Sequence, residues 1–135
     1  IAVPVGSTAT FSVSGNITID KSIGVTLPST ACNPQTQTGC NIEGFYSADE
    51  DIIIDGNGIS ACITAVLTDD DKRVNFAGAL VVNAKLRNGE LQNKRDMCAN
   101  NKSVPSFTIT ERPDLVLNAP EFIKSPTFIW QEVAP

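Results

Sequence analysis

The residue types that could support catalysis are few, and one of them is missing. The chain has 135 residues with 15 acidic and 10 basic side chains, 4 cysteines and no histidine. Without histidine it lacks the usual general base at neutral pH and cannot form a Ser-His-Asp triad. A carboxylate pair for glycoside hydrolysis is the remaining route, but the acids fall where turns are expected. We therefore predict a protein that is not an enzyme and that needs no cofactor.

The four cysteines are expected to form disulfides rather than a metal site. Their spacing contains no Cys-x-x-Cys pair, which a four-thiolate zinc site normally shows. An even number of cysteines favours two disulfides, for which three pairings are possible. The favoured pairing joins Cys32 to Cys40 around a short polar loop and Cys62 to Cys98 between distant strands. Disulfides indicate an oxidising environment, so we expect a secreted or cell-surface protein.

One acidic segment, DEDIIIDGNG, invites comparison with a calcium-binding loop. With Asp51 as the first ligand of an EF-hand, Asp55 and Gly56 fall at suitable positions. Ile53 and Cys62, however, stand where the loop needs oxygen ligands, so the motif fails. The expectation is therefore no metal, with solvated turns explaining the acids. A looser calcium site is the alternative, with Asp49, Asp51, Asp69 and Asp71 as candidate ligands.

A polar segment, CNPQTQTGC, lies between Cys32 and Cys40. A disulfide there would hold an exposed loop whose amide and hydroxyl side chains are suited to hydrogen bonding. The loop either recognises a partner or only connects two strands and is held by the disulfide. Its candidate recognition residues are Gln35 and Gln37, together with Tyr46, an aromatic residue expected to lie exposed in a nearby loop.

Strands must position these side chains, because apolar residues alternate with period two along much of the chain. The clearest case is 74–86, where one face is expected to be buried. Asn88 and Gly89 supply the residues that a type I′ hairpin turn favours, so the chain is expected to return antiparallel. The expected meander consists of 51–54, 59–67, 74–86 and 90–94. Further strands are expected at TATFSVSG, NITID, IGVTL, SFTITE, LVLNA and TFIWQEV.

The number of strands favours an all-β fold. No segment of helical length shows the i, i+3, i+4, i+7 apolar spacing, although 96–102 has room for one turn. About eight to ten short strands with frequent turns are typical of a sandwich or barrel. We expect a single domain over 1–135, an antiparallel β-sandwich of immunoglobulin-like type with two disulfides. The sequence shows no internal repeat of the lengths found in repeat proteins.

The charge is unevenly distributed along the chain. Residues 1–71 carry a net charge of −8, residues 72–135 carry +3, and the whole chain carries −5. An acidic chain without a basic tract argues against nucleic acid as a partner. No apolar run is long enough for a membrane helix, so we expect no membrane insertion.

The first residues form an uncharged extended stretch, with no charge before Asp20. Its small, hydroxyl-bearing and alternating apolar residues, followed by a disulfide-containing β domain, resemble subunits of bacterial fimbriae and pili. The resemblance implies donor-strand assembly, in which an extended segment of one subunit completes a sheet of the next. Residues 1–13 would then form a protruding donor strand, with Pro4 as a departure from a regular strand. The implied assembly residues are Ile1, Val3, Val5, Phe11 and Val13.

Two functions therefore remain open. The first is an extracellular structural subunit of pilus or fimbria type, which forms a homopolymer of identical or related subunits by adding its N-terminal strand to a neighbour. The second is a monomeric secreted recognition module, such as an adhesin, effector or inhibitor, which binds through the Cys32–Cys40 loop region.

Overall fold

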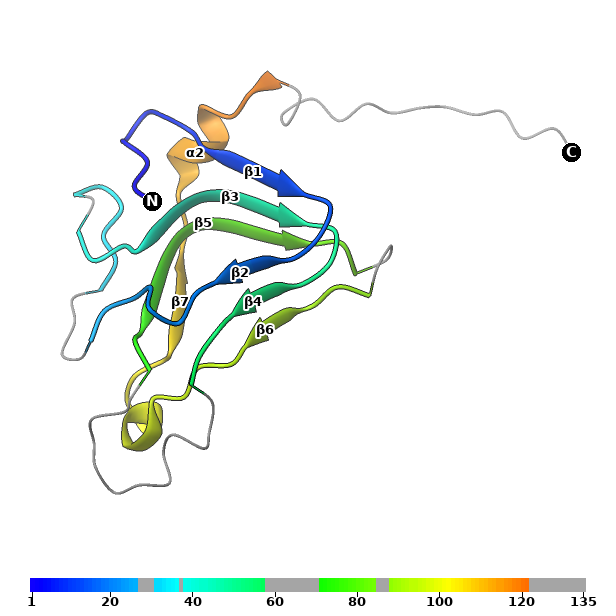
Figure 1. Cartoon of the computed structure of the whole chain (residues 1–135). Helices are drawn as coiled ribbons and strands as arrows, with labels where there is room; N and C mark the ends of the chain where they lie inside the picture. Colours follow the sequence, from blue (N-terminus) through cyan, green and yellow to red (C-terminus); the bar gives the residue numbers. More distant parts are fainter. Residues whose placement is uncertain (27–30, 37, 58–70, 85–87, 122–135) are drawn as a thin grey trace, which may run out of the picture.

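A computed structural model describes residues 1–26, 31–36, 38–57, 71–84 and 88–121 of the chain. Within these residues, seven strands form two sheets (Figure 1). Sheet A has four strands in the order β1-β3-β5-β7, and sheet B has three in the order β2-β4-β6. The strands of sheet A are β1 Thr10–Val13, β3 Ile42–Ala48, β5 Val74–Val82 and β7 Phe107–Thr110. Those of sheet B are β2 Ile17–Ile19, β4 Ile52–Ile54 and β6 Leu91–Asn93.

All described strand pairs in both sheets are parallel, so the predicted antiparallel immunoglobulin-like β-sandwich is wrong. Parallel neighbours cannot be joined by a tight hairpin and need a long connection between them. Here the connection passes through the other sheet. The chain runs along a strand of sheet A, turns, and runs back along a strand of sheet B (Figure 1).

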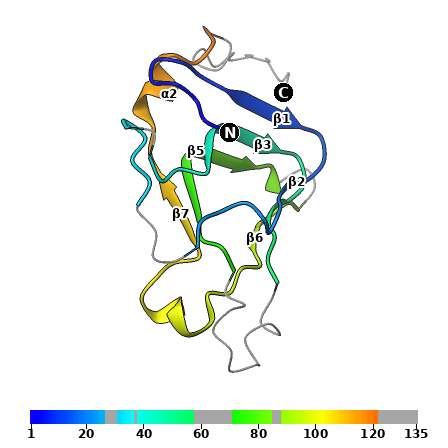
Figure 2. The ribbon, with the colours of Figure 1, turned by 60° about the vertical axis from the view of Figure 1, so that its left-hand side comes forward.

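This path makes each turn of the chain one coil of a parallel β-solenoid. Coil one contains β1 and β2, coil two β3 and β4, coil three β5 and β6, and coil four begins with β7. Thr10 pairs with Phe45 and Phe45 with Ala79, which are steps of 35 and 34 residues. Seen from the side, the coils lie one above the other (Figure 2). The structure therefore repeats, although the sequence shows no repeat.

The turn at Asn88 and Gly89 explains why a hairpin was expected. Asn88 has a positive φ of 53°, which agrees with its prediction as a turn residue. The two strands that it separates, β5 and β6, belong to different sheets, so the turn changes sheet and does not pair its flanking strands.

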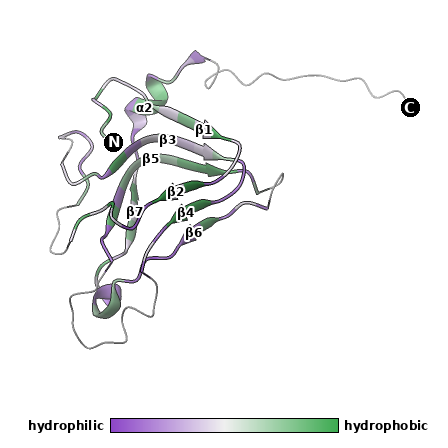
Figure 3. Cartoon of the chain, in the orientation of Figure 1, coloured by the Kyte–Doolittle hydropathy of each residue, from purple (hydrophilic) through white to green (hydrophobic). Residues whose placement is uncertain are grey.

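The core lies between the two sheets. Alternate residues point inward, and both β2 and β4 are strongly hydrophobic (Figure 3). Phe11 stacks on Tyr46 with ring centroids 4.7 Å apart, and Tyr46 meets the edge of Phe76 at 5.5 Å. The central hydrophobic cluster comprises Ile19, Ile42, Tyr46, Ile54, Val74 and Phe76.

Two non-strand elements complete the described structure. The short 3₁₀ helix Cys98–Lys102 lies within 96–102, where one helical turn was expected. The helix α2, Pro113–Leu117, falls on the predicted strand LVLNA and overturns that prediction. Pro113 is at its first position, where the fixed φ of proline suits a helix and no backbone donor is lost.

One disulfide joins described residues, Cys32 to Cys40, as predicted. The other favoured pairing involves Cys62, which lies outside the described residues. The same holds for the predicted strands at 59–67 and in TFIWQEV. The segment IGVTL has no strand in its described part, where Val25 forms only an isolated bridge with Arg73.

Candidate functional site

The solenoid has two ends, and both expose side chains that point toward the core. At the first end, formed by coil one, Phe11 and Val13 of β1 are 39% and 38% exposed. At the last end, Leu91 of β6 and Ile109 of β7 are 45% and 49% exposed. Equivalent interior positions in coil two, such as Ala48 and Ile52, are fully buried. The exposure arises because an end coil has a neighbouring coil on one side only.

The backbone at these ends is also unpaired within the described residues. β1 and β2 each pair with one strand, and β6 pairs only with β4. β7 pairs with Val74 to Ala77 of β5, which leaves the second half of this nine-residue strand without a described partner on that side. We call this open part of coil three, residues 79–82 and 91–93, the coil-three corner. Residues 10–13 and 17–19 form the coil-one corner.

Both corners lack charged residues and proline, two of the features that normally protect exposed strand edges. Natural proteins place charged residues, proline or bulges on such edges to prevent pairing with another chain. The strand sequences TFSV and ITI of the coil-one corner contain no charge and no proline. The same is true of ALVV and LQN in the coil-three corner.

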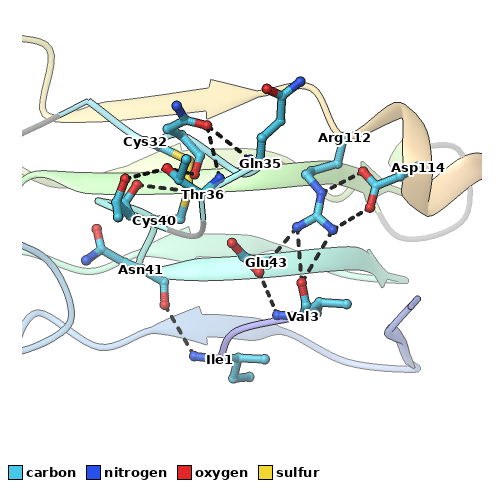
Figure 4. Close-up of polar contacts among 12 residues, drawn as sticks. Ile1, Val3, Cys32, Gln35, Thr36, Cys40, Asn41, Glu43, Arg112 and Asp114 are labelled. Carbon is cyan, nitrogen blue, oxygen red and sulfur yellow. Dashed lines mark hydrogen bonds and ion pairs between the residues drawn. A yellow bond between two sulfur atoms is a disulfide. The ribbon is translucent and has the colours of Figure 1, made fainter. Parts of the chain in front are cut away.

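A second cluster holds the N-terminal residues on the outer face of sheet A (Figure 4). Glu43 points to this face and is 1% exposed, because it is covered by Val3 and Arg112. The backbone N–H of Val3 donates to Glu43 Oε2 at 2.5 Å, and Arg112 Nη1 lies 3.3 Å from the same oxygen. Arg112 also donates to the carbonyl of Val3. Val3, predicted to belong to a protruding donor strand, is thus buried against its own chain.

Every donor of the Arg112 guanidinium has a partner in this cluster. Nε and Nη2 donate to the two carboxylate oxygens of Asp114 at 2.7 and 2.6 Å, and the other donors reach Val3 and Glu43. The hydrogen bond from Arg112 lowers the pKa of Asp114, and the same bond raises the pKa of Arg112. Arg112 therefore holds the N-terminal residues and Asp114 against sheet A. Because its donors are occupied, it has no donor left for a ligand.

The Cys32–Cys40 loop lies beside this cluster (Figure 4). Asn33 Oδ1 accepts from the backbone N–H groups of Gln35 and Thr36, which orders the described part of the loop. Gln35 is exposed, whereas Gln37 lies outside the described residues. A cavity of about 260 Å³ opens between the loop and the start of α2. Its lining residues are Val5, Pro34, Gln35, Glu111, Arg112, Pro113 and Asp114.

Tyr46 is not the exposed loop residue that the sequence suggested. It lies in β3 with only 8% of its surface exposed, between the rings of Phe11 and Phe76. Burial raises the pKa of its phenol, whose hydroxyl donates to the carbonyl of Glu43. Tyr46 therefore belongs to the core and takes no part in the recognition loop.

The candidate calcium ligands are dispersed among different structural roles. Asp51 accepts hydrogen bonds from the backbone of Glu90 and the side chain of Gln92, and so joins coils two and three. Asp71 is buried and accepts from the backbone and side chain of Asn57. Asp69 lies outside the described residues. No group of three or more possible metal ligands occurs in the described part of the chain.

Arg95 is a further buried basic residue that sequence reasoning missed. Its guanidinium donates to the backbone carbonyls of Asp20, Ile23, Asp55 and Lys72. Desolvation by the surrounding chain lowers its pKa. Arg95 thereby connects the loops of successive coils.

An apolar groove of about 500 Å³ lies between α2 and the outer face of sheet A. Phe45, Gly78 and Ala79 form its floor, and Val116 and Leu117 of α2 form one wall. No structural feature identifies an occupant for it. Among the described residues, no helix is long and apolar enough to cross a membrane.

The chain matches no protein-family model, and comparison with curated proteins and with solved structures finds no similar protein.

Proposed function

We propose that this protein is a structural subunit without catalytic activity, which assembles with further copies through the open ends of its β-solenoid. The observation that carries the proposal is the exposure of core-type side chains at both ends, on strand edges that lack charge and proline. Burial of such side chains and pairing of free edges both favour strand addition between chains.

Two further observations support a structural role. The chain has no histidine, and the buried groups Glu43 and Arg112 form an ion pair in which every guanidinium donor is occupied. The Cys32–Cys40 disulfide agrees with an extracellular location, since such bonds persist in oxidising surroundings. We propose secretion or display on a cell surface.

The proposed assembly places the contact at Phe11 and Val13 and not at the first five residues. Val3 is already buried against Glu43 and Arg112 within its own chain. Phe11 and Val13 are exposed on a strand whose second edge has no partner among the described residues.

The test is self-association of the purified protein, followed by sedimentation velocity over a concentration series and by electron microscopy. We expect oligomers or filaments that dissociate on dilution. The variant Val13→Lys places a charge on the coil-one edge and is expected to keep the protein monomeric, because strand edges with lysine resist pairing. Its lysine can extend to solvent through the open end, so the fold should be retained.

The matched control is Val5→Lys, the same substitution at a valine that is 59% exposed and belongs to neither corner. We expect this variant to associate like the unmodified chain. A protein that stays monomeric at its highest soluble concentration would overturn the proposal, as would equal loss of association in both variants.

The cavity beside the Cys32–Cys40 loop favours recognition of a partner as a second candidate function. Its walls combine exposed Gln35 with Pro34 and Val5, which suits a short peptide with a polar and an apolar group. A peptide array probed with the unmodified chain and with Gln35→Ala tests this function. Selective binding that Gln35→Ala weakens would support it, and identical binding patterns would contradict it.

A further inference from the structure

Coil three leaves space for one strand of defined length. Strand β5 has nine residues, and β7 pairs with its first four, from Val74 to Ala77. Gly78 follows, and the last four residues of β5, 79–82, have no described partner on the side away from β3. A strand that completed this edge, which is open among the described residues, would thus be four residues long.

The coil-one strand β1 has this length and already occupies the equivalent position on its own chain. The register connects Phe11 to Tyr46 and Tyr46 to Leu80, and likewise Val13 to Ala48 and Ala48 to Val82. In sheet B, Ile17 to Ile19 pair with β4, whose residues pair in turn with Leu91 to Asn93 of β6. In sheet A, successive register partners therefore lead from β1 through β3 to residues 79–82. In sheet B, they lead from β2 through β4 to residues 91–93.

From this register we propose that the partner is a second copy of the chain, whose coil-one corner docks on the coil-three corner. This inference rests on the proposed function and specifies its contact. β1 of the incoming copy lies beside β5 in line with β7, and its β2 lies beside β6. Both sheets then continue from one chain into the next with all strands parallel.

The backbone groups and side chains at this contact are compatible. Ala9 and Val13 accept from β3 through their carbonyls, so the N–H and C=O groups of Ser12 point to the free edge. The N–H of Val74 donates to the carbonyl of Ser106, on the side of β5 where β7 lies. Backbone groups alternate in direction along a strand, so the N–H and C=O groups of Leu80 and Val82 point to the same side, where β5 is open.

The side chains of the incoming copy continue the interior columns of coil three. Its Phe11 covers Leu80, its Val13 covers Val82, and its Ile17 covers Leu91. Each of these pairs brings together apolar side chains that are partly exposed in the single chain.

Docking also requires a local exchange at the N-terminus. The carbonyl of Ile1 accepts from the N–H of Glu43, so the N-terminus lies beside β3 at this residue. Glu43 is the register partner of Ala77, and Ala77 pairs in turn with Thr110 of β7. In the docked pair, β7 of the first copy takes the place that Ile1 and Ala2 occupy beside β3 of the incoming copy. These two residues must therefore leave their position when the copies join.

The test is site-directed cross-linking between two variants that are mixed and mildly oxidised. The register places Ser12 of one copy opposite Val81 of the other, because both pair with Ser47. Neighbouring strands bring such residues within the Cα separation that a disulfide spans. We expect a cross-linked dimer from Ser12→Cys mixed with Val81→Cys and none from either variant alone.

A third variant, Thr108→Cys, separates this inference from the proposed function. It places the thiol on β7, where a copy stacked only on the last strand would contact it. Cross-linking of Ser12→Cys to Thr108→Cys in place of Val81→Cys would overturn the docking inference while leaving assembly intact. Absence of both cross-links and of association would overturn both proposals.

Removal of Ile1 and Ala2 provides an independent measurement. If their displacement opposes docking, the shortened chain should associate more tightly, on the order of tenfold, because it loses no N-terminal hydrogen bonds on docking. Weaker association of a shortened chain that unfolds like the full chain would contradict the exchange at β3 and with it the docking geometry.

Discussion

At the scale of single residues, the most informative group is the buried ion pair between Glu43 and Arg112. Glu43 lies in a strand of otherwise apolar and small residues, IEGFYSA, and is almost wholly buried. An acid within such a strand is a sequence signal for a buried partner, because an isolated buried charge is strongly unfavourable. The signal does not identify Arg112, which lies 69 residues further along the chain.

Removing the basic partner should destabilise the fold. In Arg112→Met, Glu43 would remain buried without its cation, and breaking such a pair costs about 3–5 kcal/mol of unfolding free energy. Urea unfolding followed by circular dichroism measures the loss. The double variant Glu43→Leu with Arg112→Met should recover part of the lost unfolding free energy. If Arg112→Met is as stable as the unmodified chain, Arg112 does not stabilise the fold through Glu43.

Asp114 gives the cluster a pH dependence. Its pKa lies below the ordinary value of 3.8 because Arg112 donates to its carboxylate, so the unfolded chain takes up this proton first as the pH falls. The stabilisation is complete above about pH 5 and declines as the pH falls through 3.8 toward the lower pKa of the folded chain. The stability difference between the unmodified chain and Asp114→Asn should therefore shrink on acidification below this value. A constant difference would show that the ion pair does not form.

At the scale of elements, sheet A bends where two glycines meet. Gly44 of β3 and Gly78 of β5 are register partners, with φ of 129° and 138°. The backbone of Gly44 lies against the position that a Cβ of Gly78 would occupy. The strands curve along their length in Figure 1, and this curvature separates the part of β5 that β7 covers from the coil-three corner.

Gly78→Ala should therefore lower stability by about 1–3 kcal/mol, since an L side chain at this φ is strained and meets the neighbouring backbone. The matched control is Gly15→Ala, whose added Cβ would meet no atom within 4 Å. We expect the control to change the unfolding free energy by less than about 0.5 kcal/mol. Thermal and urea unfolding of both variants provide the comparison, and equal stability would contradict the strained bend.

At the scale of the whole molecule, the net charge of −5 should influence assembly through repulsion between copies. The strands of the two proposed docking corners are uncharged, so salt has no attractive ion pair between them to screen. Association should therefore strengthen as salt rises from about 10 mM to about 150 mM and then level off, because the Debye length falls to about 8 Å. Sedimentation velocity at several salt concentrations measures this, and association that weakens with salt would indicate a different, charged interface.

Sequence reasoning identified most strand positions but not their partners. The alternation in 74–86 located β5, although Asn75 and Ala77 on the opposite face are buried as well. Predicted strands also fall on β1, β2, β4, β6 and β7, whereas β3 was not predicted. The predicted antiparallel sandwich failed because alternation shows which side chains are buried and carries no information on strand direction. LVLNA was predicted as a strand from its apolar residues, whereas Pro113 starts a helix there.

The sequence by itself determined the positions of most described strands and the lack of histidine, and it favoured the Cys32–Cys40 disulfide that the structure confirms. These features depend on local spacing and residue type. Only the tertiary structure decided the parallel stacking of coils, the pairing of Glu43 with Arg112 and the exposure of Phe11 and Val13 at an edge without a described partner. Those features depend on contacts between residues more than 30 positions apart, which period-two alternation does not encode.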